Sequence, residues 1–169
     1  MKGDQKLRAP PEEVAKYIEA EASRRGLPPT RASGSPWSSY QVLSRGKQKA
    51  VKEHEKALCQ RGMPATFPCM TNLSQSPYWM GPTADVVPAL LRASVLWSFR
   101  LRRVALPLEH LELQGWAMFD SSSGPQSCQC IGAFRQLSDQ KLRQLAGNGM
   151  HLAVIGSVLA FALACTEVV

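Results

Sequence analysis

The first third of the chain contains two stretches in which apolar residues recur at helical spacing. Residues 10–25 begin with two prolines and two glutamates, which suit the first turn of a helix, and Gly26 suits its end. Residues 41–61 form the second stretch, which Gly62 closes. Between them, residues 27–40 are rich in proline, serine and glycine. The pattern therefore predicts two helices joined by a linker.

Apolar positions in the rest of the chain fall into shorter runs. Residues 63–88 contain several prolines and little periodicity, which predicts irregular structure. Residues 89–101 are apolar and half-alternating, and fit either a strand or a short helix. Residues 107–115 predict a helix of one to two turns that ends at glycine, and Ser138 is a suitable cap for another helix. In the short helix we expect three leucines to pack inward: Leu108, Leu111 and Leu113.

The last apolar run covers residues 150–165 and predicts a helix in which nearly every residue is apolar. A membrane-spanning helix needs about 20 apolar residues, and this run is shorter. A buried core helix is therefore favoured over a membrane anchor, and a membrane is not an expected partner. We expect the helix either to fold back on residues 89–97 or to drive association.

Basic residues exceed acidic ones, and the excess is concentrated near the N-terminus. The chain has a formal net charge of +7, and residues 1–60 carry 12 Lys/Arg against 7 Asp/Glu. Spacings of three and four place Lys49, Lys52 and Lys56 on one helix face, which is suitable for contacting phosphates. The alternative is an ordinary solvated face, balanced by Glu53 and Glu55.

The cysteines indicate free thiols in a reducing, intracellular compartment. There are five of them, and no apolar segment typical of a secretory signal opens the sequence. Cys128 and Cys130 form a Cys-x-Cys pair without a histidine at ligand spacing. A zinc site needs about four ligands, so no metal site is expected.

Residues 103–116 resemble a block found near the end of cytosine-C5 DNA methyltransferases, of the form Arg-x-Leu-x-Pro-x-Glu-x-x-Arg-Leu-Gln-Gly-Phe-Pro. The matching residues are Arg103, Pro107, Glu109, Leu113, Gln114, Gly115 and Trp116. The departures are Ala105, Glu112 and Ala117, which stand where the family has leucine, arginine and proline. The resemblance implies a structural role for Arg103, Glu109, Gln114 and Gly115, with the arginine and glutamate in a buried polar network.

The sequence Leu145-Ala146-Gly147-Asn148-Gly149-Met150 resembles the last block of the same family, Gln-x-Gly-Asn-(Ser/Ala)-Val, which precedes an apolar helix. In that family this turn approaches S-adenosylmethionine. The resemblance therefore implies that Gly147, Asn148 and Gly149 bind this cofactor. Such a role is chemically reasonable, because glycine allows close backbone approach and a helix N-terminus offers free N–H groups to a carboxylate. A weaker resemblance covers residues 73–77 and 87–94.

The family's catalytic blocks have no counterpart in this chain, so the resemblance, over about residues 70–167, assigns it no catalytic residue. The Gly-rich cofactor turn and the Glu-Asn-Val segment are absent. Cys69 follows Phe67-Pro68, as the family's nucleophile follows proline, but it lies too close to Arg103 in sequence to leave room for the intervening blocks. An unreactive thiol is therefore favoured at Cys69.

These features predict an α-dominated α+β fold with a few short strands. Residues 1–62 would form a basic helical extension, and residues 63–169 the C-terminal portion of a methyltransferase-like domain. The resemblance implies a nuclear protein with DNA as partner and a reaction that transfers a methyl group from S-adenosylmethionine to cytosine. The chain would be a fragment, one half of a split enzyme completed by a second chain, or an inactive derivative. The alternative is a non-catalytic basic protein that binds nucleic acid or protein, or one with a membrane-seeking C-terminal helix.

Overall fold

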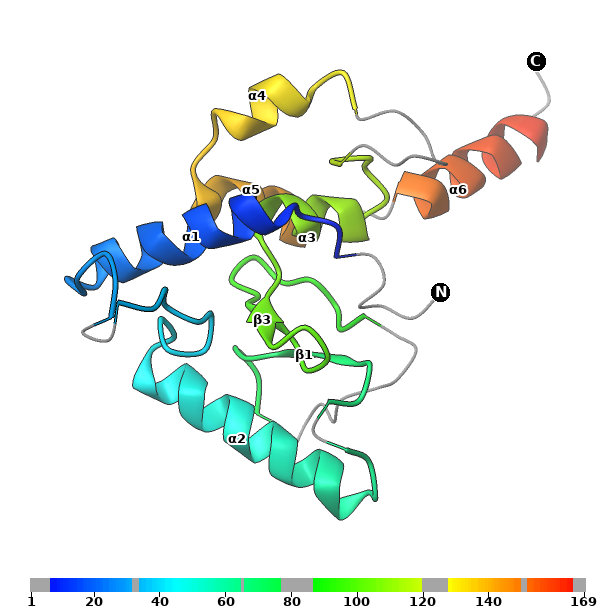
Figure 1. Cartoon of the computed structure of the whole chain (residues 1–169). Coiled ribbons are helices and arrows are strands. Elements are labelled where there is room, and N and C mark those ends of the chain that lie inside the picture. The colour runs from blue at the N-terminus through cyan, green and yellow to red at the C-terminus, as the bar shows by residue number, and fades with distance from the viewer. Residues whose placement is uncertain are drawn as a thin grey trace. The chain divides into compact units, whose positions relative to one another are not determined.

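The computed structural model describes residues 7–31, 34–64, 66–76, 87–119, 128–149 and 152–165. The elements in this part of the chain, in order, are α1 (Pro11–Arg24), α2 (Arg45–Gln60), β1 (Met70–Asn72), β2 (Leu96–Ser98), β3 (Arg103–Val104), α3 (Pro107–Leu113), α4 (Ile131–Arg135), α5 (Asp139–Asn148) and α6 (Leu152–Cys165). Figure 1 shows how helices dominate and how small the sheet is. The prediction of an α-dominated α+β fold is confirmed.

The chain forms two compact units. The first extends to Ala89 and resumes over Ser94–Leu106, and the second consists of Leu90–Ala93 and Pro107–Val169. The boundary expected after residue 62 therefore falls inside the first unit. The reason is that α2, from the expected extension, supplies core residues to the same cluster as the strands.

The first unit is built on an antiparallel three-stranded sheet in the order β1-β2-β3. Thr71 pairs with Trp97, and Trp97 pairs in turn with Val104. Every residue of β1 and β2 is buried, so neither strand shows the polar–apolar alternation of a half-exposed strand. For this reason the sequence predicted irregular structure over residues 63–88, where β1 lies. The same lack of alternation left strand and helix open for residues 89–101, which contain β2.

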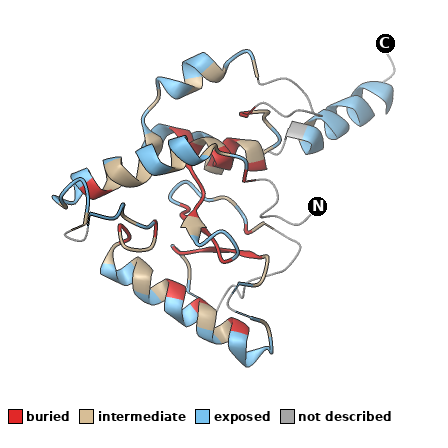
Figure 2. Ribbon diagram, in the orientation of Figure 1, coloured by how far each residue is buried: buried red, intermediate tan, exposed pale blue. Residues whose placement is uncertain are grey.

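Helix α2 covers part of this core. Val51 and Leu58 are fully buried and belong to the same apolar cluster as Trp97. The helix begins four residues later than predicted, because the Ser44 side chain accepts a hydrogen bond from the Lys47 N–H and so caps the first turn. Figure 2 shows the buried positions on α2 alternating with exposed ones, as expected for a helix with one face in a core.

The end of the predicted linker belongs to this core. The ring of Tyr40 lies edge-on to that of Trp97, with centroids 6.3 Å apart. Ser39 is buried and accepts a hydrogen bond from the Val104 N–H at 3.0 Å. Residues 27–40 contain no helix or strand in their described part, as expected of a linker, but their last residues pack against the strands.

The second unit is centred on the contact between α3 and α5. Helix α3 ends at Leu113, and the chain turns away at Gly115, the predicted stop, whose φ of +94° is accessible to glycine and strained for other residues. Helix α5 begins as predicted, with the Ser138 hydroxyl accepting from the Lys141 N–H. Leu111 and Leu142 are buried.

Candidate functional site

Two segments that resemble the methyltransferase family meet where α3 packs on α5. The Nε2 atom of Gln114, just after α3, donates a hydrogen bond to the backbone oxygen of Ala146 in α5 at 2.9 Å. Ala146 is fully buried. The side chain of one block therefore holds the backbone of the other, although the two residues are distant in sequence.

Gly147 of α5 packs against residues 91–92, which belong to the third segment that resembles the family, residues 87–94. A Cβ atom on Gly147 would lie 2.4 Å from the nitrogen of Arg92 and 2.4 Å from the carbonyl carbon of Leu91. Real Cβ atoms do not approach backbone so closely, so this position requires glycine. The close neighbour in the structure is the protein's own backbone, and residues 91–92 occupy the space that glycine leaves open.

Asn148 and Gly149 lie at the end of α5. Asn148 is the last residue of the helix and Gly149 follows it, and both are exposed. The family's turn before the apolar helix is not formed by this Gly-Asn pair, because α5 continues through Asn148, and α6 begins only at Leu152. The Gly149 N–H is already bonded to the Leu145 oxygen at 2.8 Å, and a helix C-terminus carries the negative end of the dipole. The binding of S-adenosylmethionine by Gly147, Asn148 and Gly149 stays a prediction, without support from a helix N-terminus.

The arginine and glutamate of the first block lie in different compact units. Arg103 is half-buried in β3, where its guanidinium donates to the oxygen of Val104 at 3.0 Å. Glu109 is completely buried in α3. An exposed surface pair is therefore excluded for Glu109, whereas the polar network implied by the resemblance stays a prediction.

His110 is a buried residue of the same helix that sequence reasoning did not single out. It is 1% exposed, and neither ring nitrogen has a hydrogen-bond partner within the described residues. Burial, and to a smaller extent the charge of Arg143 on α5, lower the pKa of His110 to about 3, so the ring is neutral at physiological pH. Of the three leucines expected to pack inward, Leu111 and Leu113 are buried and Leu108 is half-buried. His110 lies three residues after Pro107 and three before Leu113, and this helical spacing to two buried residues was the signal for its position.

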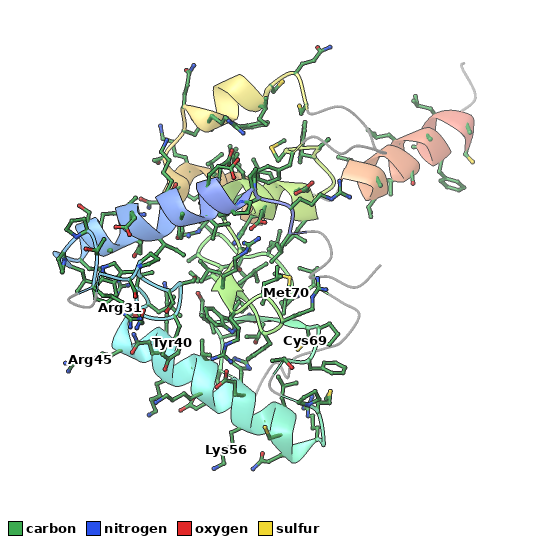
Figure 3. All side chains as sticks on the ribbon, viewed as in Figure 1. Arg31, Tyr40, Arg45, Lys56, Cys69 and Met70 are labelled. Atoms are coloured by element: carbon green, nitrogen blue, oxygen red, sulfur yellow. The ribbon has the colours of Figure 1, made fainter. Side chains whose placement is uncertain are left out.

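The basic face of α2, defined by Lys49, Lys52 and Lys56, is exposed as expected. Figure 3 shows Lys56 projecting from this helix. Lys49 lies 3.8 Å from Glu53, a weak surface pair. Glu55, expected to balance the lysines, instead bonds to Arg102 at 2.6 Å in the turn after β2.

Cys69 does not offer a nucleophile to solvent. It is 1% exposed and belongs to the apolar cluster of the first unit, beside β1 in Figure 3. Its backbone oxygen accepts from the Phe99 N–H at 3.2 Å. A thiol placed in this core cannot reach the C6 atom of a DNA base without unfolding of the strand.

Helix α6 is exposed on all sides, which corrects the expectation of a buried core helix. Phe161 and Leu163 are 71% and 77% exposed, and Figure 2 shows the whole described helix at the surface. No described side chain of α6 is buried, as packing on residues 89–97 would require. Among the described residues, the segment Asp139–Cys165, which includes α5 and α6, is long and apolar enough to cross a membrane by length and composition, which is weak evidence taken alone.

The arrangement of α3, α5 and residues 91–92 is thus defined by contacts within this chain. No protein-family model matches the sequence, and no curated protein matches it. The methyltransferase resemblance therefore rests on the residues quoted above and on the way in which they meet.

Proposed function

We propose that this chain is the C-terminal part of a cytosine-C5 DNA methyltransferase-like protein and that it is inactive by itself. The observation that carries the proposal is the junction of α3 with α5. Gln114 holds the carbonyl of Ala146, and Gly147 admits the backbone of Arg92. Three segments that were chosen for their resemblance to one family thus contact one another. Segments that resembled the family by chance would have no reason to lie together.

The chemistry of the family reaction supports the inactivity of the isolated chain. Covalent attack on cytosine needs an activated thiolate and an acid that works with it as a unit. The one thiol that follows a Phe-Pro pair, Cys69, is buried in an apolar core. S-adenosylmethionine and DNA would therefore be bound jointly with a complementing methyltransferase segment, in the nucleus.

Helix α6 supports the same proposal. A helix that is apolar on every side is stable in water only when other surfaces cover it. None of its described side chains is buried in this chain. In the proposed assembly, the complementing segment supplies the missing apolar surface.

The test is complementation of methyl transfer. The full chain is mixed with a cytosine-C5 methyltransferase fragment that carries the Gly-rich cofactor turn and the Pro-Cys loop but ends before its own arginine–glutamate block. We expect no incorporation of labelled methyl groups into DNA by either piece and measurable incorporation by the mixture.

Two variants separate the junction from general folding. Gly147→Ala should abolish complementation, because a Cβ meets the backbone of Arg92. Gly132→Ala, at a position where a Cβ has open space, should leave complementation intact. Methyl transfer by the chain alone, or the absence of both binding and activity in the mixture, would overturn the proposal.

A second candidate function is a non-catalytic module that binds nucleic acid through the basic face of α2. The observation that favours it is that Glu55 is engaged by Arg102 and does not neutralise this face. Exposed lysines at phosphate-contacting positions gain affinity by releasing counterions from DNA.

Salt dependence of DNA binding tests this candidate. In the double variant Lys52→Gln/Lys56→Gln, the slope of log affinity against log salt should fall by about two, since each phosphate contact contributes roughly 0.9. The control, Lys16→Gln/Lys141→Gln, makes the same charge change on exposed residues of α1 and α5. A salt-independent affinity, or equal losses in both variants, would exclude this face.

A further inference from the structure

Cys128 and Cys130 are held close together just before α4. The Cys128 N–H donates to the oxygen of Ala117 at 2.6 Å, which ties this turn to the segment after α3. The Cys130 N–H points back to the Sγ atom of Cys128 at 3.4 Å. The turn therefore directs the first sulfur toward the backbone of the second cysteine.

The two thiols differ in exposure and in their hydrogen bonds. Cys128 is half-buried and Cys130 is exposed. A hydrogen bond to Cys128, followed by the charge of Cys128, raises the pKa of Cys130. The Cys128 sulfur accepts the Cys130 N–H, and a backbone N–H directed at a sulfur atom stabilises negative charge that forms there during attack.

We propose that Cys128 and Cys130 form a reactive dithiol that exchanges with small disulfides of the glutathione class. The Cys128 thiolate attacks one sulfur of oxidised glutathione, whose disulfide bond breaks and releases one glutathione thiolate. The Cys130 thiol then loses its proton and attacks Sγ of Cys128, which releases the second glutathione. Two protein thiols are oxidised to one disulfide, and one small disulfide is reduced to two thiols.

The other thiols of the chain lack this arrangement. Cys69 is buried in the core of the first unit. Cys59 and Cys165 are exposed on α2 and α6, and neither has a cysteine near it in sequence to displace a bound glutathione. A disulfide closed over a single intervening residue is strained, and strained disulfides are readily reduced again. The pair is therefore suited to reversible exchange.

Oxidised glutathione added to the reduced full-length protein tests this site, with mass spectrometry of the tryptic peptide that spans residues 104–135. We expect this peptide to lose two hydrogen atoms and to retain no glutathione, while Cys59 carries a glutathione adduct. In Cys130→Ser, the adduct should remain on Cys128 and form faster than the adduct on Cys59. In Cys128→Ser, the adduct on Cys130 should form more slowly than the adduct on Cys128 in the other variant.

Cys59→Ser is the matched control, because it removes an exposed thiol outside the pair. It should leave disulfide formation between Cys128 and Cys130 unchanged. Stable glutathione on the native peptide without an internal disulfide would overturn the proposal. So would an adduct on Cys128 of the Cys130→Ser protein that forms no faster than the one on Cys59.

Discussion

The side-chain amide of Gln114 donates to the backbone oxygen of Ala146 across a distance of 2.9 Å. This bond links the residue that follows α3 to the last turns of α5. It occupies a carbonyl near a helix end, where backbone oxygens lack partners within the helix. The two helices of the second unit are therefore joined by a specific polar contact as well as by apolar packing.

Loss of this contact should weaken the second unit. Gln114→Ala is expected to lower the free energy of unfolding by about 1–2 kcal/mol, because a net hydrogen bond is lost and the buried Ala146 carbonyl is left without its partner. Urea unfolding measures the change. Gln140→Ala, at an exposed position of α5, should stay within about 0.5 kcal/mol of the native chain.

Gly147→Ala should be more damaging than an ordinary glycine replacement. The new methyl group would lie within 3 Å of the Leu91 and Arg92 backbone, and we expect a loss of about 1–3 kcal/mol from overpacking. Gly46→Ala in α2 meets open space and should be neutral or stabilising by up to about 1 kcal/mol. Equal effects in the two variants would show that residues 91–92 do not pack against Gly147.

His110 should make stability fall as the solution becomes acidic. Its folded-state pKa of about 3 lies below the ordinary value of 6.5, so the unfolded chain binds a proton first as the pH falls. The contribution of the neutral ring is complete above pH 6.5 and is lost progressively as the pH drops toward 3. The slope is at most about 1.4 kcal/mol per pH unit.

His110→Leu removes this titration and should flatten the slope. Unfolding free energies at pH 7, 6 and 5 compare the native chain with the variant, and these values lie above the range in which most carboxyl groups titrate. Burial also lowers the pKa of His54 in the first unit, and that contribution is present in both proteins. Parallel pH profiles would contradict the assignment of a buried neutral ring to His110.

Helix α6 should make the isolated protein associate. Phe161 and Leu163 are almost uncovered, and exposed apolar patches of this kind promote association. We expect Val158→Gln/Phe161→Gln/Leu163→Gln to convert oligomers into monomers in analytical ultracentrifugation, without loss of helix in α5. Neutral lipid vesicles test whether α6 binds a membrane instead of a second protein surface. Partition of the native chain into the vesicles would indicate a membrane-seeking helix. A native chain that is monomeric without detergent or lipid would contradict the prediction.

The ends of several helices could be predicted because they depend on nearby residues. Ser138 caps α5 through a bond to Lys141, and Gly115 ends α3 with a backbone angle that suits glycine. The exposure of Lys52 and Lys56 also follows from helical spacing. Each of these features is decided within one or two turns of the chain.

The strands and the candidate site could not be predicted from nearby residues, because they depend on contacts between distant segments. β1 is three residues long and is stabilised by β2, which follows it only after a long intervening segment. Asn72 shows the same dependence, because its side-chain oxygen accepts the Val95 N–H while its amide donates to Ser94. Neither partner is near it in sequence.

By itself, the sequence determined the helical character of α1, α2, α3, α5 and α6, the Ser138 cap, the basic face of α2 and the apolar character of α6, since each of these depends on local spacing and composition. It did not predict α4 or the Ser44 cap of α2. The tertiary structure alone decided that Gly147 faces Arg92, that Glu109 and His110 are buried, and that α6 is left uncovered. The physical reason is that burial and close backbone approach depend on which distant segments pack together. In this chain, no local pattern specifies that packing.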